Sequence, residues 1–139
     1  MKENLSLIDE VRRDAFEKSR GVEKGERCFE LISFMCKLNE LARKEGLLAV
    51  AETEVPSNID LSGDIRQALD RFVETASTDD LTKILTDQYW DKNFQGENAL
   101  LYYMIILSFV NLGIKNSQEF EQLLLSCLDN VGVTSDSML

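Results

Sequence analysis

The stretch Ala99–Val110, which reads ALLYYMIILSFV, decides the fold because it is the most apolar segment of the chain. A helix that is apolar all round is either enclosed by other helices or crosses a membrane. A membrane span needs about 20 apolar residues, and this run reaches only about 16 even when Asn111 and Gly113 are counted. Charged residues also lie close to both of its ends. We therefore expect a central core helix near residues 97–112, which Gly113 brings to an end.

Other segments show the periodicity of amphipathic helices suited to enclosing this central helix. Their apolar residues recur at spacings of three and four, which is the pattern of one helix face. The chain has one proline and seven glycines, few enough to favour long helices joined by short loops. We therefore predict an all-α fold, a compact helical array of five or six helices. The outer helices are expected at about residues 5–20, 26–50, 60–76, 78–90 and 116–128.

The second outer helix carries apolar residues on two sides. Phe29 and Ile32 lie on one side, while Leu31 and Phe34 lie on the other. A helix that is apolar on both sides is expected to be buried on both. Pro56 marks the limit of this helical region, because proline disfavours helix in the residue before it and lacks a backbone donor.

Polar residues mark the expected starts of two later helices. Ser77 and Asn116 have short side chains that accept hydrogen bonds from the free N–H groups of a first turn. Asp79 and Asp80 suit the positive end of the helix dipole. Glu119 follows Asn116 at the spacing of a capping box. These positions predict helices that begin near residues 78 and 117.

The length of 139 residues fits one domain with a single core. We assign residues 1–139 to a single helical domain. Within it, residues 1–20 form a leading helix that Gly21 and Gly25 attach loosely. Residues 130–139 are expected to form a frayed tail, since they are small, polar and terminal. The oligomeric state is open between a monomer and a homodimer.

The net charge of −10 restricts the kind of partner. A nucleic-acid-binding protein needs a basic surface that displaces counterions from phosphates, and this chain has no such basic cluster. The same charge opposes docking on anionic lipid. It would steer the domain toward a basic surface of another protein. We therefore expect no nucleic acid and no membrane insertion, and a protein partner with a basic surface.

The residues that carry chemistry in most enzymes are missing. The chain has no histidine, which excludes every Ser–His or Cys–His nucleophile. Cys28, Cys36 and Cys127 form no CxxC pair, so we expect neither a metal nor another cofactor. Reduced thiols and the lack of a signal peptide over residues 1–10 favour a cytoplasmic protein. We predict that the chain is not an enzyme, although chemistry by paired carboxylates alone stays a third hypothesis.

Three aromatic residues suggest an alternative function. Trp90, Tyr102 and Tyr103 lie on or beside the two helices that flank the loop near residue 94. Aromatic side chains at helical spacing usually belong to the core, but they also line pockets that bind small molecules. The alternative to protein binding is therefore a small-molecule-binding helical domain, with its pocket between these helices.

The segment Leu38–Val50, which reads LNELARKEGLLAV, resembles the LAxxARxEGLLALE stretch of flagellar stator proteins of the MotA family. In that family the stretch belongs to cytoplasmic helices, and an arginine and a glutamate in it face the rotor protein FliG. Arg43 matches the arginine, whereas Ala51 stands at the glutamate position with Glu52 beside it. A shift of one residue turns a side chain by about 100° around the helix. The chain also lacks the family's four membrane spans and hence its proton channel.

The resemblance implies a non-enzymatic protein-interaction module, a soluble relative of the stator cytoplasmic domain. It places the contact face on charged residues in and just after this segment. We predict that the exposed contact residues are Arg43, Lys44, Glu45 and Glu52.

Overall fold

Seven α-helices make up the part of the chain that this computed structural model describes, residues 2–22, 25–75 and 77–129. That part contains no strand, which confirms the all-α prediction. The helix count is one above the expected maximum, because one expected helix is divided in two. The residues 130–139 of the expected tail lie outside the described part. The helices are α1 (Lys2–Lys18), α2 (Glu26–Glu45), α3 (Leu47–Ala51), α4 (Ser62–Glu74), α5 (Thr78–Lys92), α6 (Glu97–Asn111) and α7 (Ser117–Asp129).

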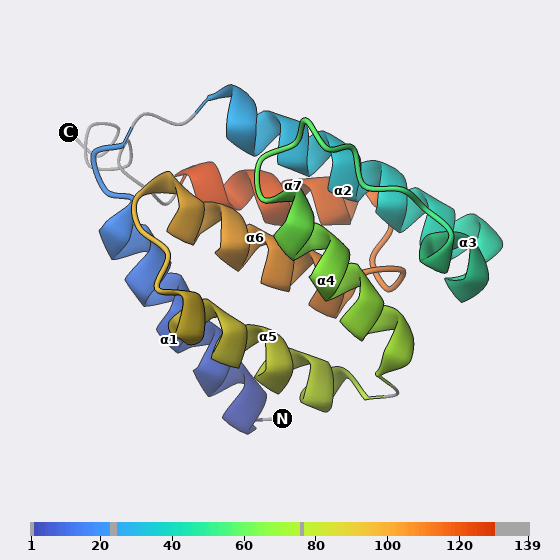
Figure 1. The fold of residues 1–139 in the computed structure, drawn as a ribbon, viewed down its shortest axis with the longest axis horizontal. Helices are drawn as coiled ribbons and strands as arrows, with labels where there is room; N and C mark the ends of the chain where they lie inside the picture. Colours follow the sequence, from blue (N-terminus) through green and yellow to red (C-terminus); the bar gives the residue numbers. More distant parts are fainter. Residues whose placement is uncertain (1, 23–24, 76, 130–139) are drawn as a thin grey trace.

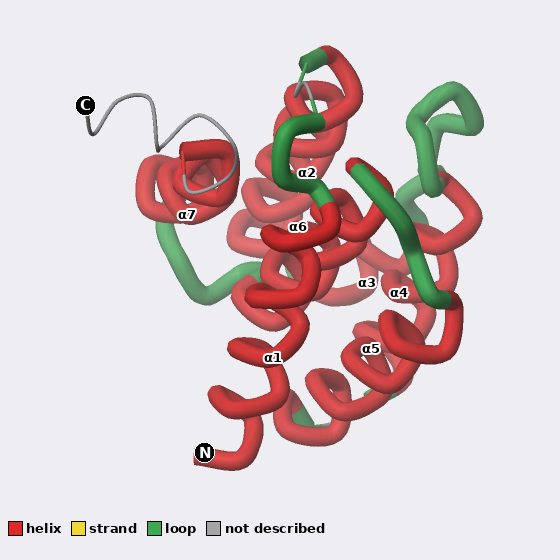
Figure 2. Tube along the Cα trace, turned by 90° about the vertical axis from the view of Figure 1, so that its left-hand side faces the viewer, coloured by secondary structure: helices red, strands yellow, loops and turns green. Residues whose placement is uncertain are grey.

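The apolar helix α6 lies at the centre of the array. It contacts α1, α5, α4, α7 and α2. Figure 1 shows α6 between α2 on one side and α1 with α5 on the other. Figure 2, turned by 90°, places α7 on the side of α6 that faces away from α4 and α5. The other helices thus enclose α6, as its sequence predicts.

The burial of α6 agrees with its composition. Ten of its residues are buried, and they lie on every side of the helix. It ends at Asn111, and Gly113 follows in a left-handed conformation with φ of 79°. A non-glycine residue adopts that conformation only at a cost, so glycine suits this turn. Among the described helices, none combines the length and apolar character that crossing a membrane requires.

The expected helix over residues 26–50 is divided at Gly46, which has φ of 89°. The break lets α3 fold back beside α4. The prediction that this region is buried on both sides is wrong for Phe29, whose side chain is 53% exposed. The buried residues of α2 instead form one stripe at spacings of three and four, and Phe29 lies outside it. That stripe consists of Cys28, Leu31, Ile32, Met35, Leu38 and Asn39.

The leading helix α1 packs against α5 and α6. Val11 and Ala15 are fully buried in this contact. The hydroxyl of Tyr89 donates a hydrogen bond of 2.6 Å to Asp14 Oδ2, and Lys18 pairs with the same carboxylate oxygen at 3.1 Å. The loose attachment expected for this segment stays a prediction.

Both predicted helix starts are confirmed. The Ser77 side chain accepts a hydrogen bond from the backbone N–H of Asp80, and α5 begins at the next residue after Ser77. Asn116 Oδ1 accepts from the backbone N–H of Glu119 at 2.8 Å, directly before α7. Each contact satisfies a backbone donor that the first helical turn leaves free.

Candidate functional site

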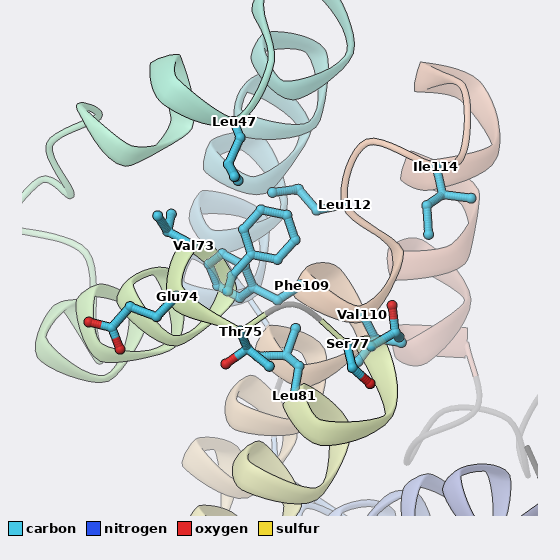
Figure 3. A pocket seen from close by; sticks show the side chains of 12 residues that line it. Leu47, Val73, Glu74, Thr75, Ser77, Leu81, Phe109, Val110, Leu112 and Ile114 are labelled. Atoms are coloured by element: carbon cyan, nitrogen blue, oxygen red, sulfur yellow. The ribbon is translucent and has the colours of Figure 1, made fainter.

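An open apolar groove lies where the C-terminal ends of α4 and α6 meet α3 and the start of α5. Its volume is about 480 Å³, and it is open to solvent along one side. Figure 3 shows Leu47 and Leu81 pointing into it from opposite ends, with Phe109 between them. We call it the α3 groove. Its lining consists of Leu47, Phe72, Val73, Glu74, Thr75, Ser77, Thr78, Leu81, Phe109, Val110, Leu112 and Ile114.

Exposed apolar side chains gather at this groove. Leu47 and Ile114 line it and are 52% and 68% exposed, and the neighbouring Leu48 on α3 is 75% exposed. The described residues include six large hydrophobic side chains that are exposed, so half of them lie at one place. Single exposed apolar residues are ordinary on protein surfaces, whereas several of them beside one groove are a feature that interaction sites share.

A buried amide fixes the wall of the groove that contains Ile114. Asn39 on α2 is fully buried, and its side-chain oxygen accepts a hydrogen bond of 2.7 Å from the backbone N–H of Gly113. Its side-chain nitrogen donates to the carbonyl oxygen of Lys115 at 3.1 Å. The two bonds clamp the turn between α6 and α7 against α2. Ile114 lies between the two clamped residues, so its exposed position is set by the core.

The four predicted contact residues surround α3. Arg43, Lys44 and Glu45 occupy the last turn of α2, Glu52 directly follows α3, and all four are exposed. Arg43 reaches toward the groove, with its Nη1 atom 3.5 Å from the carbonyl oxygen of Ile114. The side chains of Arg43, Lys44 and Glu45 are consecutive in a helix and therefore point about 100° apart. These residues and Glu52 thus do not form one flat face. They frame the apolar residues of α3.

We call this combined region the α3 surface. It comprises the α3 groove together with Leu48 and four charged residues, Arg43, Lys44, Glu45 and Glu52.

The two ends of the groove differ in charge. Arg43 lies near Ile114 at one end, and the exposed Asp79 and Asp80 stand in the first turn of α5 at the other. Figure 3 shows the Glu74 carboxylate turned away from the apolar lining, and Arg71 pairs with it at 3.4 Å. The acidic residues at this end of the groove are thus Glu74 in the last turn of α4 and Asp79 and Asp80 in the first turn of α5.

The residues of the alternative ligand site differ in exposure. Trp90 is 45% exposed, whereas Tyr102 and Tyr103 are buried. Tyr102 stacks on Phe94 with ring centroids 4.8 Å apart, and Tyr103 meets Phe16 edge-on at 5.7 Å. Burial raises the pKa of both tyrosine hydroxyls above their usual range, so these groups stay neutral. Their rings pack against protein neighbours, and a ligand pocket beside them stays a prediction.

A polar cluster elsewhere joins three elements around Arg27. Its guanidinium contacts Asp60 and Asn98 and pairs with Glu97 at 3.0 Å. The thiol of Cys28 donates to the other carboxylate oxygen of Glu97 at 3.3 Å. Because its members bond to one another across α2, α6 and the loop before α4, this cluster is suited to holding the fold.

The cysteines and acids form no evident reactive centre in the described residues. Cys28, Cys36 and Cys127 form no disulfide in the described part of the chain, and Cys36 is only partly buried. Burial raises the pKa of Cys127 to about 12, which keeps this thiol protonated and unreactive at neutral pH. No group of three potential metal ligands occurs in the ranges that the structure describes.

The features found here define an all-α domain with an open, mostly apolar groove framed by charged residues. An apolar groove with a polar rim has the chemistry of a binding surface, since burial of its side chains would supply affinity. No protein family, curated protein or solved structure matches the chain.

Sequence reasoning missed the apolar half of this site. The predicted contact residues do not include Leu47, Leu48, Ile114 or Asn39. The signal in the sequence was a glycine before each apolar group, Gly46 before Leu47 and Gly113 before Ile114. Such glycines mark chain reversals, which place the residues after them at the surface.

Proposed function

We propose that this chain is a non-enzymatic protein-interaction module that docks its partner through the α3 surface. The observation that carries the proposal is the gathering of Leu47, Leu48 and Ile114 around one open groove. A soluble domain gains nothing in stability from leaving these side chains in water, whereas a partner that covers them gains about 25 cal/mol for each Å² of apolar area buried. The charged residues of the α3 surface would then form the rim that sets specificity.

The resemblance to the MotA family supports the same location. The residue that matches the family's rotor-facing arginine, Arg43, is exposed at the edge of the groove. At the glutamate position Ala51 is partly buried, and the neighbouring Glu52 is exposed. We propose that the chain is a relative of the stator cytoplasmic domain, and the rotor protein FliG is then the first partner to test. The net charge of −10 favours a basic contact surface on the partner.

Binding to purified FliG, and retention of partners from a motile host, tests both parts of the proposal. Leu48→Ser and Arg43→Glu should each weaken binding about tenfold, since loss of a central contact costs more than about 1 kcal/mol. Phe29→Ser is the matched control, because Phe29 is similarly exposed at the other end of α2. Equal retention by Leu48→Ser and the wild type would refute the docking surface. The chain could instead fail to bind FliG but retain another partner that Leu48→Ser releases. That result would refute the stator relationship and leave the docking surface standing.

A further inference from the structure

The chemistry of the α3 groove restricts what its occupant can be. Eight of its twelve lining residues are aliphatic or aromatic, and the other four are Glu74, Thr75, Ser77 and Thr78. The hydroxyl of Ser77 is already engaged by the backbone N–H of Asp80. The backbone N–H and C=O groups of a bound polypeptide that lie against the eight apolar residues would find no partner there. Unpaired backbone groups are costly to bury, so the occupant must satisfy them internally.

An α-helix meets this requirement, since all its central backbone groups bond within the helix. An extended peptide that pairs its backbone groups with the protein commonly does so by adding a strand to the edge of a sheet. The described residues contain no strand that would offer such an edge. A helix that lays one apolar side into the groove presents anchors at spacings of three, four and seven residues.

Charge restricts the occupant further. The exposed Asp79 and Asp80 lie at the α5 end of the groove, and the whole chain carries a net charge of −10. A cationic helix would be attracted by these two aspartates and by the overall charge, whereas Arg43 at the other end of the groove would repel its cationic side chains. A second copy of this chain would bring another ten negative charges and would be repelled.

The geometry points to a basic amphipathic helix of a partner protein as the occupant of the α3 groove. Its apolar side contacts Leu47, Phe109 and Ile114, and its Lys or Arg residues face Asp79 and Asp80. This inference rests on the proposed function, because it names the structural class of the partner element that docks at the α3 surface.

A designed peptide is the probe that tests this inference. It has about 18 residues, which is five helical turns, with leucines on one side and lysines on the other. A second peptide replaces every lysine by glutamate, and a third scrambles the leucines out of helical period. Fluorescence anisotropy of labelled peptide is measured with the full chain at about 0.15 M salt, where weak long-range attraction is screened. The Leu/Lys peptide should bind at least about tenfold more tightly than either control peptide.

Variants of the chain locate the binding site. Leu47→Glu and Ile114→Glu should each weaken the Leu/Lys peptide at least about tenfold, and Phe29→Glu, an exposed apolar residue with the same charge change, should not. Leu47→Ser serves as a milder variant, and thermal melting checks that each variant is folded. Equal binding of the three peptides, or equal binding by Leu47→Ser and Phe29→Glu, would overturn the inference.

Two further results separate this inference from the proposed function. Light scattering could show a dimer that becomes a monomer in Leu47→Ser. A second copy would then fill the groove, which overturns the basic helix as occupant. A protein partner could bind the wild type but not Leu48→Ser, while the Leu/Lys peptide does not bind at all. That result would also overturn the helix assignment. In that case the docking surface itself would stand.

Discussion

Asn39 holds the backbone of Gly113, with 2.7 Å between the Asn39 Oδ1 atom and the Gly113 amide nitrogen. The two residues belong to elements far apart in the sequence, α2 and the turn that follows α6. The second bond, from Asn39 Nδ2 to the Lys115 carbonyl, fixes the turn on the other side of Ile114. The two hydrogen bonds of the buried Asn39 thus hold the exposed Ile114 at the edge of the α3 groove.

Asn39→Ala is expected to destabilise the fold by about 2 kcal/mol, because it leaves the Gly113 N–H and the Lys115 carbonyl without their partner. Urea denaturation measures the change. Lys37→Ala, an exposed substitution on the same helix, should change stability by no more than about 0.5 kcal/mol. Equal effects of the two substitutions would contradict the role given to Asn39.

Gly113→Ala should cost about 1 to 2 kcal/mol, since residue 113 has φ of 79° and the added Cβ would lie 3.4 Å from Ala42 Cβ. Gly63→Ala is the matched control. Gly63 lies in the first turn of α4 with no positive φ, and nothing lies within 4 Å of its added Cβ. There alanine should be neutral or stabilising by up to about 1 kcal/mol. Thermal melts that rank the two substitutions in the opposite order would contradict the account of this turn.

The bond between Tyr89 and Asp14 should help to hold α1 against α5. A double-mutant cycle with Tyr89→Phe and Asp14→Ala is expected to give a coupling energy of about 1 kcal/mol. Additive effects within error would mean that this contact contributes nothing to docking α1. That result would favour the loose attachment that the glycines after α1 suggest.

Stability should fall above pH 9 partly because of Cys127. Burial raises the pKa of this thiol in the folded chain to about 12, from an ordinary value of 9.0. The unfolded chain then loses its thiol proton first as the pH rises, which favours unfolding. The contribution is complete below pH 9 and is lost progressively toward pH 12.

Comparison with Cys127→Ala measures this contribution. Between pH 9.5 and 10.5, stability of the wild type should fall by about 1 kcal/mol per pH unit more than that of Cys127→Ala. The comparison uses slopes, because removal of a buried sulfur also lowers stability at every pH. Parallel slopes would show that this thiol titrates alike in the folded and unfolded chain.

The sequence predicts the helices and the central place of α6 well, since both follow from local properties. The run Ala99–Val110 is apolar on every side and too short to cross a membrane, so it is expected to be enclosed by other helices. The starts at Ser77 and Asn116 depend on contacts within four residues of each cap. Local chemistry of this kind is visible without knowledge of the tertiary structure.

The α3 groove could not be predicted in the same way, because its walls come from four separate helices and one turn. The break at Gly46 turns α3 toward α4 and exposes Leu47 and Leu48. The one continuous helix predicted over residues 26–50 contains no such change of direction. The charged residues of the α3 surface were predicted from resemblance, whereas its apolar residues needed the packing of distant segments.

Photo-crosslinking from position 48 in living cells tests the central claim most directly. A benzophenone side chain replaces Leu48 in one variant and Phe29 in a control variant, since both positions are exposed and lie near opposite ends of α2. The account predicts a discrete protein adduct from position 48 that is absent from position 29. Ile114→Glu should abolish that adduct, because Ile114 lines the same groove. No adduct from position 48, or the same adducts from both positions, would contradict the claim that the α3 surface docks a protein.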